Sequence, residues 1–225
     1  MHILLVAATS FEIAAVTDFL DRHNYRYNHH TIDAAITGVG SISTTYHLTE
    51  QVNANRPDYL IQAGIAGSFS PIHPPGSIVI VQEEIVADTG VEENGVWTDL
   101  FDMKLQESIM PYTGKALVNP YCTDWERYGL PLVKGITINE ITTQPNRIQQ
   151  WQQKYSPVVE SMEGAAFHYT ALMEDIPFLQ LRSISNYVGE RDKAKWKMKE
   201  AIEGLNEMLI KMLSEWSVVS GEYTI

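Results

Sequence analysis

The chain contains 225 residues, of which 16 are Lys or Arg and 28 are Asp or Glu, so its formal net charge is -12. This excess of negative charge repels phosphate backbones and anionic lipid surfaces, which argues against nucleic acid or a membrane as a partner. Cys122 is the single cysteine, which excludes an internal disulfide and a thiolate metal cluster and suits a reducing cytoplasm. The length is sufficient for one α/β domain over residues 1–225.

The amino-terminal run Met1–Ala8 is apolar, but it is too short for a secretory signal peptide and lacks a basic leader. We expect this run to form a buried first strand. No later segment approaches the roughly 20 consecutive apolar residues that a membrane helix requires. The sequence therefore predicts a soluble, cytoplasmic protein.

Strand-like runs rich in β-branched residues alternate with segments of helical length along the chain. The predicted strands are Ile3–Ala8, Ala34–Thr37, Tyr59–Ala63, Ser77–Glu84, Gly114–Asn119, Leu132–Asn139, Val158–Ser161 and Phe178–Ser185. The predicted helices are Phe11–His23, Ile42–Asn55, Asn146–Tyr155, Gly164–Glu174 and Lys193–Val218. This alternation predicts an α/β fold in which helices cover a mostly parallel sheet.

The stretch Asp88–Tyr112 has the weakest periodicity, and we interpret it as an excursion from the sheet. A long irregular excursion is more often functional or mobile than inert. We predict that its first part, Asp88–Trp97, forms an interface between subunits.

Two carboxylates lie beside predicted strands. Glu163 follows the apolar run Pro157–Val159 and precedes the small residues Gly164–Ala166. In that setting a carboxylate can accept two hydroxyl hydrogen bonds from a sugar, or it can simply favour the positive end of the helix dipole. Glu12 follows the first strand at a predicted helix start, where it can overhang the same sheet edge or cap the helix. Two separated carboxylates suit hydrolysis of a glycosidic bond through a cationic transition state.

The segment Arg182–Asn186 ends a strongly apolar predicted strand with hydrogen-bonding groups. Asn186 lies at the carboxyl end of that strand, where open α/β sheets bind their ligands. Arg182 lies within the strand and is costly to bury alone, so we expect it to face a carboxylate or a polar cavity. The residues by themselves leave a structural ion pair and a catalytic role equally open.

Glycine-containing loops follow two predicted strands, at Gly38–Gly40 and Gly64–Gly67. Neither loop completes a dinucleotide fingerprint or a phosphate-binding loop, so each reads first as a structural turn. The seven histidines are scattered, and no Gly-x-Ser-x-Gly elbow occurs. We therefore predict no metal site, no cofactor and no serine-hydrolase chemistry.

Taken together, these motifs resemble the nucleoside phosphorylase and nucleosidase superfamily, in particular its methylthioadenosine/adenosylhomocysteine nucleosidases and futalosine hydrolases. The resemblance covers almost the whole chain and rests on the order and spacing of Ala8–Glu12, Gly38–Gly40, Gly64–Gly67, Met162–Ala166 and Arg182–Asn186. It implies a single-domain α/β fold with a mixed central β-sheet flanked by α-helices. It also implies a purine nucleoside as the substrate and a homodimer or larger homo-oligomer that completes the pocket.

The resemblance also assigns roles to individual residues. Glu12 would hold the attacking water, and Arg182 would line the water side. Met162 would pack beneath the ribose, and Glu163 would bind its hydroxyls. Phosphorylases of the superfamily hold phosphate with glycine and arginine in the loop where this chain has Glu12. Because a carboxylate repels phosphate and polarises water, the resemblance implies hydrolysis rather than phosphorolysis.

Asn186 stands where the adenine-cleaving nucleosidases carry an aspartate that delivers a proton toward N7 of the purine. An amide cannot deliver a proton, but it can donate a hydrogen bond to N7 or to a 6-oxo group, and it can also pair with the N6/N7 edge of adenine. The segment Ser185–Asp192, followed by Trp196, resembles the carboxyl-terminal signature of futalosine hydrolases. This resemblance implies cleavage of futalosine into hypoxanthine and dehypoxanthine futalosine, in menaquinone biosynthesis.

The remaining expected substrate-binding residues are Gly64, Ile65, Thr143, Gln144 and Ser185. Thr143 and Gln144 are assigned to the base because the segment Ile141–Gln144 aligns with the base-stacking loop, although it lacks the phenylalanine of the adenosine-derivative nucleosidases. A methylthioadenosine/adenosylhomocysteine nucleosidase is the enzymatic alternative. A non-catalytic nucleoside-binding protein on the same scaffold is the alternative from another functional class.

Overall fold

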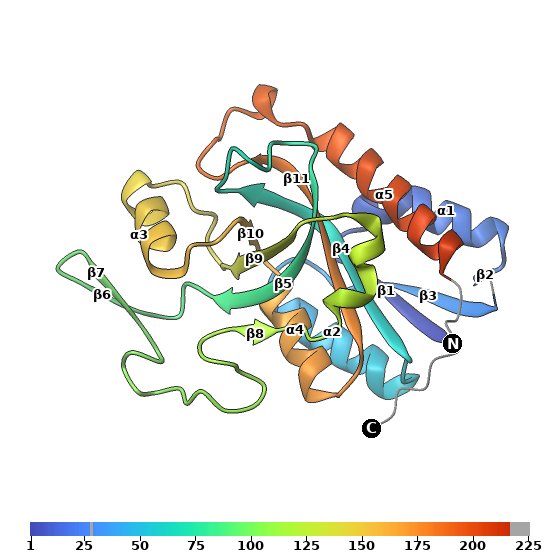
Figure 1. The fold of residues 1–225 in the computed structure, drawn as a ribbon, viewed down its shortest axis with the longest axis horizontal. Helices are drawn as coiled ribbons and strands as arrows, with labels where there is room; N and C mark the ends of the chain where they lie inside the picture. Colours follow the sequence, from blue (N-terminus) through green and yellow to red (C-terminus); the bar gives the residue numbers. More distant parts are fainter. Residues whose placement is uncertain (28, 217–225) are drawn as a thin grey trace.

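The first strand sets the layers of the fold because nearly all of its side chains are buried. This strand, β1 (His2–Ala7), lies inside a sheet that has helices on both faces (Figure 1). Successive side chains of a strand point to opposite faces, so Ile3 and Leu5 join one apolar cluster while Leu4 and Val6 join another.

The computed structural model describes residues 1–27 and 29–216. Its other strands are β2 (Arg26–Tyr27), β3 (His30–Ile36), β4 (Tyr59–Ser68), β5 (Ile78–Val86), β6 (Gly90–Glu93), β7 (Val96–Asp99), β8 (Leu117–Val118), β9 (Leu132–Thr137), β10 (Val159–Ser161) and β11 (Phe178–Tyr187). Its helices are α1 (Ala14–Arg22), α2 (Ser41–Ala54), α3 (Pro145–Tyr155), α4 (Gly164–Met173) and α5 (Met198–Glu215). Short 3-10 helices are η1 (Ser10–Ile13), η2 (Cys122–Tyr128) and η3 (Lys193–Lys195).

The main sheet has the strand order β10-β9-β5-β11-β4-β1-β3-β2, and β8 pairs with β5. Strands β3, β1, β4 and β11 run parallel, whereas β5 is antiparallel to β11, so the sheet is mixed as expected. The sheet also curls on itself, because β10 pairs in parallel with β9 and antiparallel with the far end of β4. This second pairing places β10 and the end of β11 on either side of the end of β4, and it creates the edge on which the candidate site lies.

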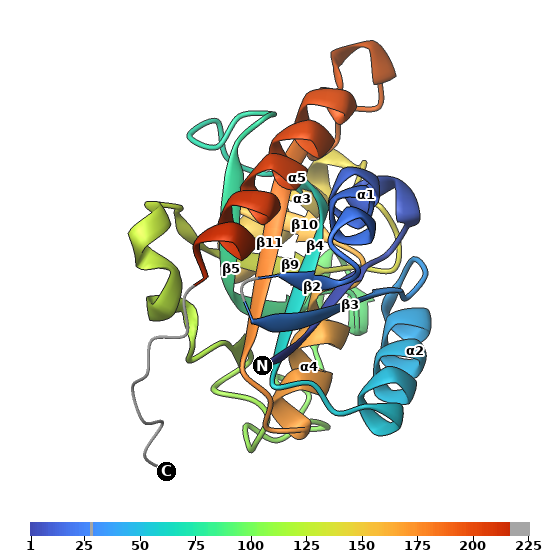
Figure 2. The ribbon, with the colours of Figure 1, turned by 90° about the vertical axis from the view of Figure 1, so that its right-hand side faces the viewer.

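Two pairs of helices cover the sheet. Helices α1 and α5 pack over one face, and α5 lies across β11 and β4 (Figure 2). Helices α2 and α4 pack against each other over the other face (Figure 1). Each buried aliphatic side chain of these helices contributes about 1.5–3 kcal/mol relative to an exposed position. The fully buried members are Val16, Leu20, Leu205 and Leu209 on one face, and Leu48, Phe167 and Ala171 on the other.

Several predicted elements differ in extent from the observed ones. The predicted strand Gly114–Asn119 reduces to β8, and the predicted strand ending at Ala63 continues as β4 to Ser68. The extension of β4 includes glycines of low β propensity, and their pairing with β10 and β11 outweighs that propensity.

Both terminal helices begin later than predicted. The first α-helix begins at Ala14, because a 3-10 turn precedes it. The predicted helix Lys193–Val218 contains the short helix η3, and its main part is α5. The break arises because the Asp192 side chain caps η3 and the Lys197 amide donates to the Ser185 carbonyl of β11. Val218 lies outside the described residues.

The excursion after β5 contains a hairpin, β6–β7, that is separate from the main sheet. Its turn is Asn94-Gly95, in which both residues have positive φ angles of 51° and 78°. The hairpin packs on α3, where the Trp97 and Trp151 rings lie 5.4 Å apart. The role of Asp88–Trp97 as a subunit interface stays a prediction.

Across residues 1–27 and 29–216, none of the helices is both long and apolar enough to cross a membrane.

Candidate active site

The ends of strands β1, β4, β10 and β11 surround a cavity of about 340 Å³. Carboxyl ends of parallel strands are the usual ligand-binding edge of an α/β sheet. Six of the predicted site residues line this cavity, namely Glu12, Ile65, Met162, Glu163, Ser185 and Asn186. The structure therefore brings together side chains that are up to 174 residues apart in the sequence, from Glu12 to Asn186.

Glu163 occupies the N-cap position of α4, yet its side chain does not cap that helix. Its Oε1 accepts a hydrogen bond from the Gly40 amide at 3.1 Å, and its Oε2 lies 3.4 Å from Nη1 of Arg182. The residue is only 5% exposed. Because each carboxylate oxygen can accept two hydrogen bonds, both oxygens retain capacity for a ligand hydroxyl. The carboxylate thus sits at the helix end while being directed at the cavity and Arg182.

Glu12 closes the turn after β1 and also reaches β4. Its Oε2 accepts hydrogen bonds from the amide and the hydroxyl of Thr9, both at 3.0 Å. Its Oε1 accepts from the Ile65 amide at 3.1 Å. Glu12 therefore caps η1, as one interpretation expected. The same bonds fix its carboxylate on the cavity wall, and its role in catalysis stays a prediction.

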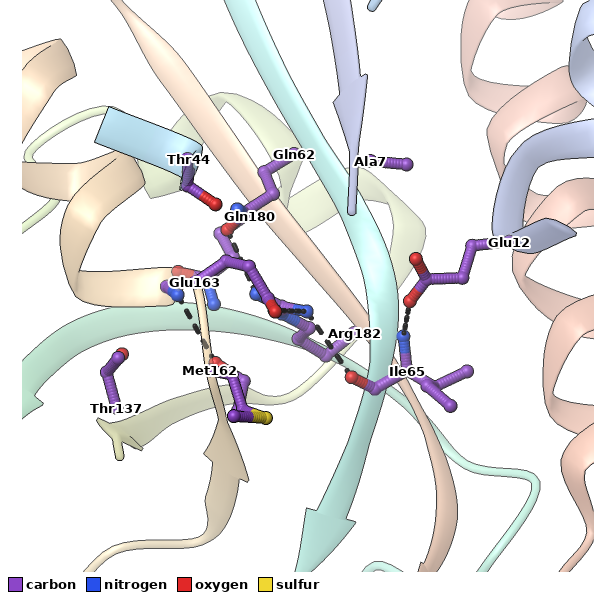
Figure 3. A network of polar contacts seen from close by, with 12 residues as sticks. Ala7, Glu12, Thr44, Gln62, Ile65, Thr137, Met162, Glu163, Gln180 and Arg182 are labelled. Carbon is purple, nitrogen blue, oxygen red and sulfur yellow. Dashed lines mark hydrogen bonds and ion pairs between the residues drawn. The ribbon is translucent and has the colours of Figure 1, made fainter. Parts of the chain in front are cut away.

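Arg182 is 1% exposed and lies behind the cavity wall on β11 (Figure 3). Its Nη1 contacts Glu163 and donates to the Ile65 carbonyl at 3.3 Å, while Nη2 donates to Oε1 of Gln62 at 3.1 Å. Arg182 does not line the cavity, so the structure places it behind the carboxylates rather than on the water side. It can act on a ligand through Glu163.

Gly64 allows β4 to pass between the charged groups. A Cβ atom at this position would lie 2.6 Å from Nη1 of Arg182 and 3.0 Å from Oε1 of Glu12. Both distances are shorter than van der Waals contact, so a larger residue would displace the guanidinium or the carboxylate. Gly64 therefore shapes the site and, like Arg182, lies behind the lining residues.

A β-bulge at the end of β11 sets the orientation of Asn186. The register with β4 shifts between Ile184 and Asn186, so that Ser185 is the extra residue of a bulge. The Ser185 hydroxyl donates to Oδ1 of Asn186 at 2.7 Å, and Nδ2 of Asn186 donates to the Tyr187 carbonyl at 2.9 Å. These bonds orient the amide and leave the second Nδ2 hydrogen available to a ligand in the cavity.

Thr143 and Gln144 lie on a neighbouring cavity of about 490 Å³, between the β6–β7 hairpin and α3. They are not among the lining residues of the cavity that holds the two carboxylates. Ile141 lines both cavities. The structure thus separates Thr143 and Gln144 from the other predicted site residues, and Ile141 is the point where the two cavities meet.

Glu160 is a cavity residue that the sequence analysis did not identify. It is 7% exposed, and its Oε1 accepts from the Thr142 amide at 3.2 Å. Among the described residues, its Oε2 has no hydrogen-bond partner. Burial raises the pKa of Glu160 to about 7. The alternation of a strand offered a signal, because Glu160 and Met162 are two residues apart and such residues share a face.

The segment after Asn186 closes the cavity from the side of α5. Arg191, Trp196 and Met198 line it, and the Arg191 guanidinium lies 5.5 Å from the centre of the Trp196 ring. The Lys197 amide ties the segment to β11. The aromatic residue of this Lys-rich stretch therefore faces the cavity, and Arg191 adds a positive charge to its wall.

A second polar network, centred on the fully buried Glu84, includes Thr137 and Gln180 (both labelled in Figure 3). Glu84 accepts hydrogen bonds from Gln180 at 2.9 Å and from Thr137 at 3.0 Å. Burial raises the pKa of Glu84 to about 7, although these two hydrogen bonds and the charge of Arg182 oppose the shift. The network contacts the start of α4, because the Thr137 hydroxyl also accepts a hydrogen bond from the Ala165 amide at 2.7 Å. It leaves no space at Gly164, where a Cβ would lie 2.0 Å from Oε1 of Glu84.

In the part of the chain that the structure describes, no group of three or more His, Cys, Asp or Glu side chains could hold a metal ion.

Residues 3–214 match the model of the Phosphorylase superfamily. The chain belongs to this superfamily. It is 28% identical over 234 residues to a futalosine hydrolase of Streptomyces coelicolor, which covers 96% of this chain and 98% of the relative. It is 26% identical over 245 residues to a 5'-methylthioadenosine/S-adenosylhomocysteine nucleosidase of Maridesulfovibrio salexigens, which covers 96% of this chain and 100% of the relative.

The fold of the phosphorylase superfamily is equally clear from solved structures. The native structure of futalosine hydrolase of Helicobacter pylori superposes with a TM-score of 0.78 at 14% identity, over 96% of this chain and 98% of that one. The expected nucleoside phosphorylase-like fold is confirmed. The relatives carry the names of N-glycosyl hydrolases, which confirms the expected enzyme class within the superfamily.

The buried carboxyl of Glu84 predicts a pH-dependent stability of this phosphorylase-superfamily chain. The pKa of Glu84 is raised from 4.5 to about 7 in the folded protein, so between these values the folded state binds more protons than the unfolded state. The free energy of unfolding must therefore fall as pH rises through this window, by about 3 kcal/mol in all. Replacing Glu84 with Gln should make the fall of the melting temperature between about pH 5 and 8 clearly shallower, and the slope that remains includes the contribution of Glu160.

The matched control is Glu83→Gln on the same strand, because Glu83 is half-buried and pairs with Lys134 near the surface. Calorimetric melting curves of the two variants and the parent protein would test the prediction. A Glu84→Gln variant whose melting temperature follows pH as steeply as the parent would contradict it.

Proposed function

We propose that this chain hydrolyses the N-glycosidic bond of futalosine, releasing hypoxanthine and dehypoxanthine futalosine in menaquinone biosynthesis. The observation that carries the proposal is the meeting of Glu12, Glu163 and Asn186 on one cavity. Two carboxylates at a sugar and an amide at a base are the groups that a purine nucleoside hydrolase needs.

Binding of the ribose rests on Glu163 and Met162. The oxygens of Glu163 are already fixed by Gly40 and Arg182, so their remaining acceptor positions meet the two ribose hydroxyls with little loss of side-chain freedom. The half-buried Met162 lines the cavity beside them and offers an apolar surface to the sugar. As the bond to the base breaks, positive charge develops on the ribose, and the adjacent carboxylate of Glu163 stabilises it.

Attack by water rests on Glu12. Its Oε1 retains acceptor capacity beside the Ile65 amide, so it can accept a hydrogen bond from a water molecule. The water oxygen forms a bond to the anomeric carbon while the bond from that carbon to the purine nitrogen breaks. Glu12 takes the proton of the water, and the bonding electrons leave with the purine.

Departure of the base rests on Asn186. Its free amide hydrogen can bond to N7 or to the 6-oxo group, where negative charge gathers as the purine leaves. Because an amide cannot give up this proton, the site suits hypoxanthine, which leaves more readily than adenine. Solvent then protonates the released base.

Water is favoured over phosphate as the attacking group because of the charge beside the anomeric carbon. Glu12 stands on the cavity wall, and in the proposed binding mode the attacking group approaches the sugar from its side. A carboxylate there repels a phosphate anion and orients a water molecule. Hydrolysis is therefore proposed in preference to phosphorolysis.

The second candidate is a methylthioadenosine/adenosylhomocysteine nucleosidase. The relative from Maridesulfovibrio salexigens carries that name and matches over nearly the full length of both chains. The amide of Asn186, where a proton donor would serve an adenine leaving group, weighs toward futalosine.

A comparison of two substrates separates the two candidates. Purified protein should release hypoxanthine from futalosine with a kcat/KM at least about 100-fold above that for release of adenine from methylthioadenosine. Chromatography of the released base gives both rates in one assay. Equal efficiency on methylthioadenosine would remove the specificity assigned to Asn186, and binding of hypoxanthine without any turnover would support the non-catalytic alternative.

The ribose carboxylate can be tested by Glu163→Gln. Gln retains an acceptor for the Gly40 amide but loses the charge that stabilises the sugar cation, so kcat on futalosine should fall by about 100- to 1000-fold. The control is Glu174→Gln, which lies just after α4 and pairs with Arg56 near the surface. Near-parental kcat in Glu163→Gln, with circular dichroism showing an intact fold, would exclude Glu163 from the mechanism.

The acidic tail of futalosine offers a third test. Arg191 is the positively charged side chain on the cavity wall within the described residues, and it is exposed. Replacing Arg191 with Gln should raise KM for futalosine by roughly three- to tenfold, the effect of an exposed charge pair. KM for inosine, which lacks the tail, should not change.

Lys193→Gln is the control for Arg191, because Lys193 is exposed nearby and does not line the cavity. Parallel increases in KM for futalosine and inosine would assign Arg191 to the shape of the loop instead of to the tail.

A further inference from the structure

Glu84 is a fully buried carboxyl group that the proposed mechanism leaves unused. Its Oε1 lies 2.9 Å from Nε2 of Gln180, and its Oε2 lies 3.0 Å from the Thr137 hydroxyl. The charge of Arg182 acts on Glu84, but Arg182 forms its ion pair with Glu163. An ionised Glu84 would be a second buried negative charge beside a cation that already has a carboxylate partner, and such a charge is costly.

His168 determines which groups of this network can donate a hydrogen bond. It is fully buried on α4, and its Nδ1 lies 3.0 Å from the Leu117 carbonyl oxygen, so Nδ1 carries a hydrogen. Burial, with the charge of Arg182 adding to the effect, lowers the pKa of His168 to about 3, so the ring is neutral. A neutral ring carries a single hydrogen. The other nitrogen, Nε2, is therefore an acceptor.

The Gln180 side chain interacts with both His168 and Glu84. When its amide nitrogen faces Glu84, its oxygen has no hydrogen-bond partner among the described residues, and neither has Nε2 of His168. Buried polar atoms without a partner are costly. This orientation therefore leaves two acceptors unsatisfied in the interior.

Half a turn of the Gln180 amide, which exchanges its oxygen and its nitrogen, satisfies both acceptors. The nitrogen then donates to Nε2 of His168, and the oxygen faces Oε1 of Glu84. Two oxygens at this separation form a hydrogen bond only if one of them carries a proton, and an amide oxygen carries none. The hydrogen-bonding capacity of the three side chains therefore assigns a proton to Glu84.

The charges around Glu84 are consistent with a protonated carboxyl. Burial raises its pKa to about 7, and the charge of Glu163 adds to this effect. The charge of Arg182 on β11 opposes it, as do the hydrogen bonds from Gln180 and Thr137. The carboxyl is therefore mainly protonated below neutral pH.

The other oxygen of Glu84 connects the network to the helix that follows Glu163. The Thr137 hydroxyl, which donates to Glu84, accepts a hydrogen bond from the Ala165 amide in the first turn of α4 at 2.7 Å. A Cβ at Gly164 would lie 2.0 Å from Oε1 of Glu84, so this turn packs directly on the carboxyl. A shift of the turn would move Glu163, and small misplacements of a catalytic group are costly.

We propose that Glu84 is a positioning residue that holds a proton in the interior, donates it in a hydrogen bond to Gln180, and fixes the first turn of α4 through Thr137. The Glu163 carboxylate is thereby held toward the cavity. The neutral state of Glu84 leaves the charge of Arg182 to Glu163. This assignment rests on the proposed function, because it takes Glu163 as the carboxylate that binds the ribose.

Infrared spectroscopy tests the proton directly, without a substrate. The carbonyl band of a protonated carboxyl should be present in the parent protein near pH 6, weaken as pH rises through about 7, and be absent from Glu84→Gln. Glu160→Gln is the control, because burial raises the pKa of Glu160 to about 7 as well, and the band of Glu84 should persist in that variant. A difference spectrum between the parent and Glu84→Gln that lacks the band would overturn the proposal.

Rescue by a neutral isostere tests the positioning role. The kinetics use whichever of futalosine and methylthioadenosine the parent cleaves. Glu84→Met has a similar length but no strong donor or acceptor, and it should lower kcat/KM by about 10- to 100-fold. Glu84→Gln is neutral and can donate to Gln180, so it should restore kcat/KM to within about threefold of the parent.

The control for Glu84→Met is Glu83→Met on the same strand, where the side chain is half-buried near the surface. Equal losses in Glu84→Met and Glu84→Gln would mean that Glu84 acts as an anion. Parental kcat/KM in Glu84→Met would mean that it has no positioning role. Either result would overturn the proposal.

A double-mutant cycle separates positioning from a general loss of stability. In a Glu163→Gln background, Glu84→Met should cause little further loss of kcat/KM, because its effect passes through Glu163. A full additional loss would contradict this. If Glu84→Met does not fold, as melting curves would reveal, Thr137→Val takes its place in the cycle. Thr137→Ser, which keeps the hydroxyl for the Ala165 amide, is then the control.

The outcomes separate this inference from the proposed function. The same pattern of variants on methylthioadenosine, in a protein that does not cleave futalosine, would retain the role of Glu84 and reject the proposed substrate. Cleavage of futalosine with equal losses in Glu84→Gln and Glu84→Met would retain the proposed function and reject the role of Glu84.

Discussion

The buried guanidinium of Arg182 is the group on which the rest of the site depends. It meets Glu163 with one nitrogen and Gln62 with another, and it also reaches the Ile65 carbonyl of β4. Removing one partner of a buried ion pair is far more costly than replacing both, because the remaining charge is left in the interior. The bare backbone at Gly64 is the condition for this arrangement, since a side chain there would occupy the place of the guanidinium.

The charged and polar side chains on the cavity wall form two pairs. Glu163 and Glu12 supply negative charge where a sugar cation would form, whereas Asn186 and Glu160 present an amide and a carboxylate on either side of Gly67. The second pairing of β10, to the end of β4, brings the two pairs of side chains to the same cavity. One curl in the sheet thus determines both the place of the proposed chemistry and the proposed choice of base.

Much of the fold could be predicted because alternation along buried strands and helical periodicity are local signals. Glu12 and Glu163 could be expected at one edge, since the ends of neighbouring strands meet there. Glu160 could not, because the face it presents depends on which strands β10 joins, and that pairing is non-local. The same limit applies to Thr143 and Gln144, which turn toward a neighbouring cavity. The hairpin had a local signal in Asn94-Gly95, but its flanking strands are short and β6 is largely exposed.

The most direct test is the identity of the sugar product formed from futalosine in heavy-oxygen water with phosphate present. Mass spectrometry reads the product. Hydrolysis supported by Glu163, which Arg182 holds in place, and by Glu12 predicts free dehypoxanthine futalosine with one heavy oxygen at the anomeric carbon, together with an equal amount of hypoxanthine. A sugar 1-phosphate, or no release of hypoxanthine at all, would contradict it.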